Sequence, residues 1–211
     1  MPADPQPMAQ TAAEAVERLA AKHQAREMAL KASRDIIRLS ANAIRAVHRH
    51  EMDDAQRLIA EAAAQAAALR ESRADHPDLY FTGYAQDAQK EYAEACAAYA
   101  FIAQTALPAP GDIGVEDAPY LNGLAEAASE LRRYILDSLR RDDDARCEEL
   151  MERMDEVYTL MVGVDFPDAV TGGLRRTTDQ LRAVLERTRG DLTMTMRQRR
   201  LERLLREGGG A

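Results

Sequence analysis

The sequence of 211 residues contains no tryptophan and only three phenylalanines, and aromatic residues make up 5% of the chain against 46% for all hydrophobic residues. Residues that favour strands are scarce, whereas alanine, leucine and arginine are abundant. This composition argues against a β-sandwich or a barrel and favours packed helices. We therefore expect an all-α protein.

Cysteine is also rare, because only Cys96 and Cys147 occur and they fall in different predicted helices. They form neither a CxxC pair nor the framework of a secreted disulfide-rich domain, so we expect reduced thiols. The N-terminus lacks a basic segment followed by an apolar one, and no run reaches the roughly eighteen apolar residues of a membrane span. These absences predict a cytoplasmic protein without a membrane partner.

Positive charge comes almost entirely from arginine, since Lys22, Lys31 and Lys90 are the only lysines. The formal net charge is −8, which argues against a general surface for polyanions because the long-range field repels them. Any site for nucleic acid must therefore be local. Arginine suits such a site because its guanidinium group binds phosphate through two parallel hydrogen bonds.

Apolar residues recur with the helical period along most of the chain, and from about Thr11 to His50 they predict one long helix. Connections are short and no change of composition marks a linker. We expect a single helical domain over residues 11–206, between a disordered tail of residues 1–10 and a flexible tail of residues 207–211. Six further helices are predicted at about residues 53–71, 78–105, 118–140, 143–163, 165–190 and 191–206.

Acidic residues stand on one side of the third predicted helix, where Asp87, Glu91 and Glu94 are spaced i, i+4 and i+7. After Glu94 the helix is apolar on every side, which is typical of a helix buried by its neighbours. A carboxylate that enters such a segment must be partnered, protonated or bound to a cation. These alternatives make Glu91 and Glu94 candidate ligands.

The fourth predicted helix carries a second acidic pair, Glu126 and Glu130, followed by Arg133 and Asp137 on the same face. An ordinary solvated stripe of ion pairs is one interpretation of this face. The other is a metal site, because Mg²⁺ and Mn²⁺ prefer carboxylate oxygen and two helices with acidic pairs can build one together.

Histidine does not suggest zinc, because His23, His48, His50 and His76 do not repeat at a zinc-binding spacing. We expect surface or capping roles for all four. The sequence also lacks a glycine-rich phosphate loop and a GxSxG motif.

Short segments in a fixed order resemble the translin family, and within it the translin-associated factor X branch of archaeal or prokaryotic type. SRDI is followed on the same helix by HR, KEYAEA is similar to the family motif QEYVEA, and YLNGLAE followed by SEL is similar to YLLGVAD followed by GEL. These segments are residues 33–36, 48–49, 90–95, 120–126 and 129–131.

The resemblance implies an all-α bundle of seven helices with a long N-terminal helix. It also implies a hollow homo-oligomer, commonly an octamer, that binds single-stranded or structured RNA, or single-stranded DNA, in its interior. For the factor X branch it implies a hydrolase, an endoribonuclease dependent on Mg²⁺ or Mn²⁺. The acidic residues of that site correspond to Glu91, Glu94 and Glu126, the last being aspartate in the family motif.

Further residues complete this hypothesis. Glu130 is expected as a second metal ligand or a support for the first, and Arg34 and Arg133 are expected to contact phosphates. Two alternatives remain open at this stage. One is a translin-like protein that binds RNA or DNA without cleaving it, and the other is a helical metal-binding or regulatory interaction protein.

Overall fold

The computed structural model describes residues 8–141 and 143–208, and all regular structure within them is helical, which confirms the predicted all-α class. Six of the described helices have 19 residues or more and three have four residues. The long helices are α1 (Met8–His48), α2 (Met52–Glu71), α4 (Gly83–Ala103), α6 (Asp117–Leu139), α7 (Asp144–Val162) and α9 (Leu174–Gly208). The short ones are α3 (Pro77–Tyr80), α5 (Pro110–Ile113) and α8 (Asp168–Thr171).

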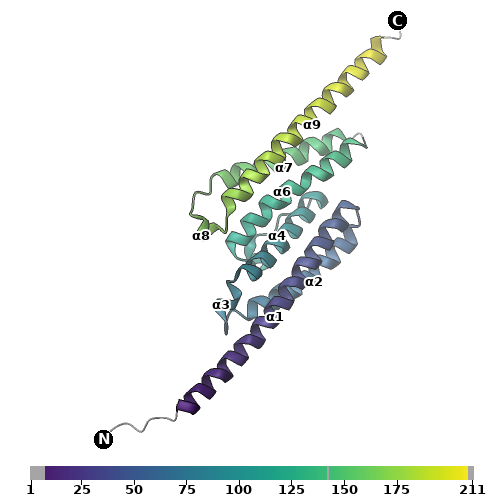
Figure 1. Cartoon of the computed structure of the whole chain (residues 1–211). Helices are drawn as coiled ribbons and strands as arrows, with labels where there is room; N and C mark the ends of the chain where they lie inside the picture. The colour runs from purple at the N-terminus through teal and green to yellow at the C-terminus, as the bar shows by residue number, and fades with distance from the viewer. Residues whose placement is uncertain (1–7, 142, 209–211) are drawn as a thin grey trace.

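The long helices form two groups of three. Helices α1, α2 and α4 pack against one another around one apolar cluster and form the N-terminal triplet (Figure 1). Helices α6, α7 and α9 pack around a second cluster and form the C-terminal triplet. The two triplets are joined mainly where α4 lies against α6. The seam between α4 and α6 is therefore the centre of the molecule.

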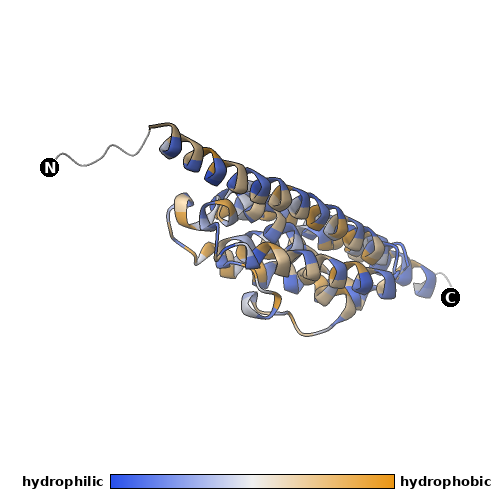
Figure 2. Cartoon of the chain, turned by 90° about the horizontal axis from the view of Figure 1, so that it is seen from below, coloured by the Kyte–Doolittle hydropathy of each residue, from blue (hydrophilic) through white to orange (hydrophobic). Residues whose placement is uncertain are grey.

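Both terminal helices extend past the bundle, and they do so at opposite ends of it (Figure 1). Along each long helix hydrophobic and hydrophilic segments alternate, as expected for helices with one buried face (Figure 2). The extensions nevertheless carry exposed apolar side chains. These are Val16, Leu19 and Met28 on α1, and Leu201, Leu204 and Leu205 on α9.

Helix boundaries differ from the sequence prediction at several places. The predicted helix over residues 78–105 is divided into α3 and α4, because Thr82 adopts an extended conformation and begins α4. The predicted sixth helix, residues 165–190, is divided by a turn at Gly172 into the short α8 and the start of α9, and α9 then continues through Gly190 to include the predicted seventh helix. A mid-helix glycine costs only about 1 kcal/mol relative to alanine, so packing of the helix outweighs it.

The predicted tails lie largely outside the described residues, which begin at residue 8 and end at residue 208. Of the predicted N-terminal tail, residues 8–10 already belong to α1. Cys96 and Cys147 are buried and unpaired, in agreement with the expectation of reduced thiols. Among the described helices, none combines the length and the apolar character needed to cross a membrane.

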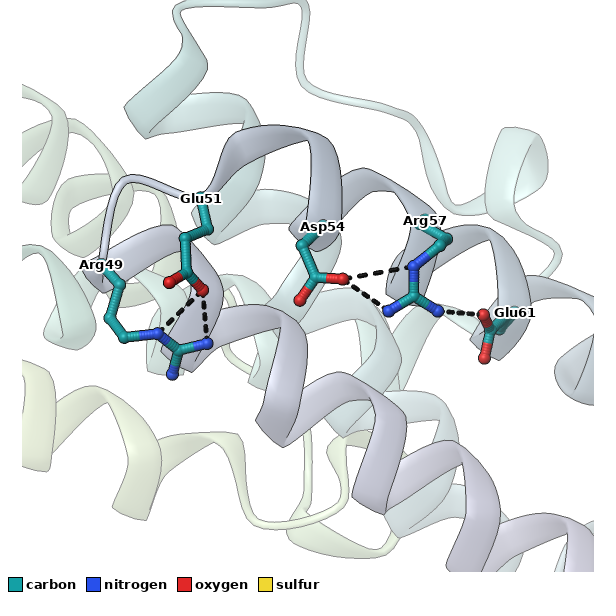
Figure 3. A network of polar contacts seen from close by, with 5 residues as sticks. All are labelled: Arg49, Glu51, Asp54, Arg57 and Glu61. Carbon is teal, nitrogen blue, oxygen red and sulfur yellow. Dashed lines mark hydrogen bonds and ion pairs between the residues drawn. The ribbon is translucent and has the colours of Figure 1, made fainter.

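The outer face of α2 shows what an ordinary charged surface of this protein looks like. Arg57 bridges Asp54 and Glu61, and Arg49 holds Glu51 through two hydrogen bonds (Figure 3). All five side chains are well exposed to solvent. Water and salt screen such pairs, so this face keeps the helix soluble and adds little to stability.

Candidate metal centre

Glu91 and Glu94 lie one turn apart on α4, at the point where this helix enters the interior. Every side chain over residues 92–98 is buried, because α4 packs against α1, α2 and α6. Four of those seven residues are alanine, which lets the neighbouring helices come close. Glu94 itself is only 8% exposed. The helix thus carries a carboxyl group into the protein interior.

Gly123 sets the distance between α4 and α6 at this point. A Cβ atom added to Gly123 would lie 2.5 Å from the carbonyl oxygen of Lys90 and 2.9 Å from the backbone nitrogen of Glu94. Any larger residue would collide with the backbone of α4. The glycine therefore allows close contact of the two helices, and Glu126, one turn further along α6, lies opposite the acidic pair.

The three carboxylates predicted from the sequence converge across this seam. One oxygen from each of Glu91, Glu94 and Glu126 can be chosen so that all three lie within 4.8 Å of one another. The side chains of Glu91 and Glu126 are 27% and 29% exposed, so the cluster opens to solvent on the side away from Glu94. A cation can enter from that side.

Burial and the neighbouring negative charges raise the proton affinity of Glu94. Its pKa is raised to about 8, first by burial and then by the negative charges of Glu91, Glu126 and Glu130, while Lys90 opposes the rise. A carboxyl group in this position holds its proton near neutral pH unless a positive charge compensates the ionised form. The positive charge near the cluster therefore does not fully compensate its carboxylates.

Lys90 supplies part of that charge. Its Nζ atom lies 2.9 Å from Oε1 and 2.8 Å from Oε2 of Glu126, and 3.4 Å from Oε1 of Glu91. The Lys90 side chain is 24% exposed and reaches the cluster from the turn of α4 before Glu94. The sequence analysis did not single out this lysine, since only the contact between helices reveals its partners.

Glu130 lies one turn beyond Glu126 on α6 but outside the group of three. Its Oε2 lies 2.8 Å from Nε2 of His48, and the hydrogen bond that the ionised carboxylate accepts from this ring nitrogen lowers the pKa of Glu130. The expectation of a surface or capping role for His48 is wrong, since its side chain is only 5% exposed. His48 continues the apolar line of Ile37 and Ile44 on α1, and this spacing was the available signal.

Arg34 and Arg133, the predicted phosphate contacts, are both exposed. Neither forms an ion pair or a side-chain hydrogen bond with another residue in the described ranges 8–141 and 143–208. Arg133 follows Glu130 on the same face of α6, and the two line a groove of about 530 Å³. A second groove of about 540 Å³ is lined by Lys90 and Asn122. The two grooves are thus lined by neighbours of the three carboxylates in sequence, Lys90 on α4 and Glu130 on α6.

The donor set fits a hard divalent cation. Ligands on opposite sides of Mg²⁺ are about 4.2 Å apart and adjacent ones about 3 Å, since each lies about 2.1 Å from the ion. The span of 4.8 Å in the cluster needs only a small contraction to meet that geometry. Three carboxylates without nitrogen or sulfur ligands favour Mg²⁺ or Mn²⁺ over zinc.

The fold and the cluster together define an all-helical protein with a candidate metal centre on the seam of two helical triplets. No protein-family model matches the chain. An uncharacterised protein of Methanocaldococcus jannaschii is 30% identical to it over 189 residues, which cover 89% of this chain and 84% of that protein.

Solved structures share the fold along nearly their whole length. The structure of AfC3PO in complex with duplex RNA and the crystal structure of AfC3PO alone each match with a TM-score of 0.83 and 31% identity, covering 90% of this chain and 98% of theirs. The crystal structure of apo-NeC3PO shares the fold with a TM-score of 0.77 at 19% identity, covering 91% of this chain and 99% of its own. The chain belongs to the C3PO family, which is the translin family predicted from its sequence.

Proposed function

We propose that this chain is an RNA-binding protein of the translin-associated factor X branch and a divalent-metal-dependent endoribonuclease. The observation that carries the proposal is the convergence of Glu91, Glu94 and Glu126 within 4.8 Å on a face that opens to solvent. Isolated acidic pairs on exposed helices do not bury a carboxylate, whereas Glu94 is buried at the base of this cluster.

The residues of the centre have separate tasks. Glu91, Glu94 and Glu126 hold Mg²⁺ or Mn²⁺, and Gly123 keeps the two helices at the distance that this requires. A bound ion supplies Lewis acidity toward a phosphate and lowers the pKa of a water molecule. Glu130 stays oriented by His48 beside the three ligands, where its charge adds to the attraction of a cation.

RNA is proposed as the substrate because AfC3PO, which shares 31% identity and the fold, was solved in complex with duplex RNA. From the family resemblance we propose single-stranded or structured RNA as the ligand, with single-stranded DNA as a further one. Arg133 lies beside one groove and Arg34 is exposed on α1, and neither guanidinium forms an ion pair among the described residues, although the charge of Arg133 helps to lower the pKa of Glu130. Both are free to contact phosphate oxygens.

The assembly proposed is a hollow homo-oligomer, an octamer, with the carboxylate centres in its interior. Apolar side chains on the projecting ends of α1 and α9 support contacts between copies, because a monomer leaves them in water. An interior site also explains how a chain with a net charge of −8 holds RNA, since acidic residues can face outward while arginines face the chamber. Native mass spectrometry measures the number of copies.

The activity is tested with a labelled single-stranded RNA incubated with Mg²⁺ or Mn²⁺. We expect cleavage by the natural protein, and loss of cleavage in E91Q and in E94Q. The matched control is E71Q, which changes an exposed glutamate on α2 in the same way. Undiminished cleavage by both E91Q and E94Q would remove the proposed centre.

One observation favours a second candidate, an RNA-binding protein without catalysis. Both carboxylate oxygens of Glu126 already lie within hydrogen-bonding distance of Lys90, so the cluster has an internal cation. RNA that binds equally well in chelator and stays intact over hours with Mn²⁺ would establish this alternative.

A further inference from the structure

Lys90 occupies the position at which a metal ion would meet Glu126. Its ammonium group contacts both oxygens of that carboxylate, at 2.9 and 2.8 Å, and lies 3.4 Å from Glu91. The lysine therefore engages two of the three carboxylates of the centre. In the family motif quoted above this position is glutamine, which carries no charge.

A divalent cation and this ammonium group compete for the same oxygens. Both oxygens of Glu126 lie within hydrogen-bonding distance of Lys90, so the ammonium group occupies part of the lone-pair capacity that an ion would use. Two positive charges within a few ångströms of each other also repel strongly in a partly buried site. Binding of the ion and the present contacts of Lys90 therefore disfavour each other.

A displaced Lys90 side chain can move into a neighbouring groove. Lys90 also lines the groove of about 540 Å³, together with Asp87 and Asp117. Asp87 stands one turn before Lys90 on α4, at the i, i+3 spacing that allows an ion pair. Within the part of the chain that the structure describes, neither aspartate has an ion-pair partner. The ammonium group of Lys90 can therefore move into the groove, where an aspartate compensates its charge.

We propose that Lys90 is an internal counter-ion of the carboxylate centre that a divalent metal must displace into the groove. Lys90 thereby lowers the affinity of the centre for Mg²⁺ and Mn²⁺ and keeps the metal-free carboxylates compensated. This role rests on the proposed metal centre and concerns how that centre is regulated. Because Lys90 competes with the metal, the fraction of centres that hold an ion depends on the concentration of free metal.

The first experiment compares Mn²⁺ binding by calorimetry in the natural protein, K90Q and K90R. We expect K90Q to bind Mn²⁺ at least about tenfold more tightly, because removal of one nearby charge relieves both competition and repulsion. K90R keeps the charge and can pair with Glu126 through two hydrogen bonds, so it should bind Mn²⁺ no more tightly than the natural protein. K31Q, which changes an exposed lysine on α1, should stay within about twofold of the natural protein.

The outcomes separate this inference from the proposed function. Equal or weaker Mn²⁺ binding by K90Q, with clear binding by the natural protein, would overturn the role of Lys90 alone. Absence of binding in both proteins would overturn the metal centre and this role with it. Thermal melting in chelator checks that K90Q is folded, and we expect its melting temperature to be lower than that of the natural protein. Addition of Mn²⁺ should raise the melting temperature of K90Q more than that of the natural protein.

The second experiment uses the natural protein, and a variant is needed only to assign the lysine resonances. The chain has three lysines, so protein with ¹³C-labelled lysine side chains gives three Cε resonances. Diamagnetic Mg²⁺ should shift one of them, the resonance that K90R lacks, and leave those of Lys22 and Lys31 in place. Saturation with Mg²⁺ that leaves the Lys90 resonance unchanged would show that the lysine is not displaced.

Discussion

The Cβ atom that Gly123 lacks would lie 2.5 Å from the carbonyl oxygen of Lys90, so the contact between α6 and α4 depends on the smallest side chain. This contact lies one turn from Glu126 on α6 and beside the acidic pair on α4. The alignment of the carboxylates therefore follows from backbone packing as well as from the acidic residues themselves.

The first prediction concerns this glycine. Gly123→Ala should force α4 and α6 apart, lowering the free energy of unfolding by about 1–3 kcal/mol and weakening Mn²⁺ binding. Urea denaturation and calorimetry measure the two effects. The control is Gly190→Ala in α9, where an added Cβ meets nothing within 4 Å. That change should stabilise the helix by up to about 1 kcal/mol, and an equal loss in both variants would contradict the prediction.

The second prediction follows from the raised pKa of Glu94, which is about 8 in the folded protein. In the unfolded chain this carboxyl group releases its proton near its ordinary pKa of 4.5. The folded state thus binds the proton more tightly, so stability in chelator should fall as pH rises from about 4.5 to about 8. The slope from this group is at most about 1.4 kcal/mol per pH unit.

Urea denaturation at several pH values in chelator measures this slope, and Glu94→Gln should flatten it. Mn²⁺ should also flatten it in the natural protein, because the ion stabilises the ionised carboxylate. E71Q on the surface of α2 should leave the profile as it is. A natural protein that gains stability across this pH range in chelator would show that Glu94 is not the dominant group.

The third prediction concerns the bond between His48 and Glu130. Since His48 lowers the pKa of Glu130, this bond contributes stability above the ordinary pKa of a glutamate, and the contribution is lost as acid protonates the carboxylate. His48→Ala should cost about 1–3 kcal/mol at neutral pH, and less at low pH. His23→Ala, at an exposed position of α1, is the control and should cost little at either pH.

The fourth prediction tests the length of the side chain at residue 126. Glu126→Asp withdraws the carboxylate by one methylene from the other two and from Lys90, so Mn²⁺ affinity should fall by about tenfold or more. Glu130→Asp should change it less, because Glu130 lies outside the group of three. Tighter binding by E126D would mean that the helices approach each other more closely than the structure shows.

The fifth prediction concerns the unpaired guanidinium groups. Arg133→Gln and Arg34→Gln should each weaken RNA binding and reduce the dependence of log affinity on log salt by about 0.7. Arg57→Gln is the control, because Arg57 is already neutralised by Asp54 and Glu61 (Figure 3). Fluorescence anisotropy over a series of salt concentrations measures both quantities, and an unchanged slope in R133Q and R34Q would exclude phosphate contacts.

Much of this architecture follows from the sequence, because the helical period of apolar residues survives in every long element. The continuation of α9 from Leu174 through Gly190 differs from the prediction since Gly190 suggested a stop, while contacts with α6 and α7 keep the helix continuous. A local signal cannot anticipate stabilisation by distant segments.

The candidate site was predictable only in part. The resemblance singled out Glu91, Glu94 and Glu126, and their spacing placed each pair of carboxylates on one helical face. The roles of Gly123, Lys90 and His48 depend on contacts between residues that are distant in sequence, such as Lys90 with Glu126, 36 positions apart, and His48 with Glu130, 82 positions apart. Periodicity along one helix carries no information about such partners.

The position of the carboxylates between the two triplets has a mechanical consequence. An ion held there by two residues of α4 and one of α6 would link the two triplets. The triplets would then unfold together when the ion is bound, and more independently when it has been removed. Amide hydrogen exchange along α4 and α6 would then slow in step on loading, and the same ion that serves the chemistry would decide how firmly the two halves hold together.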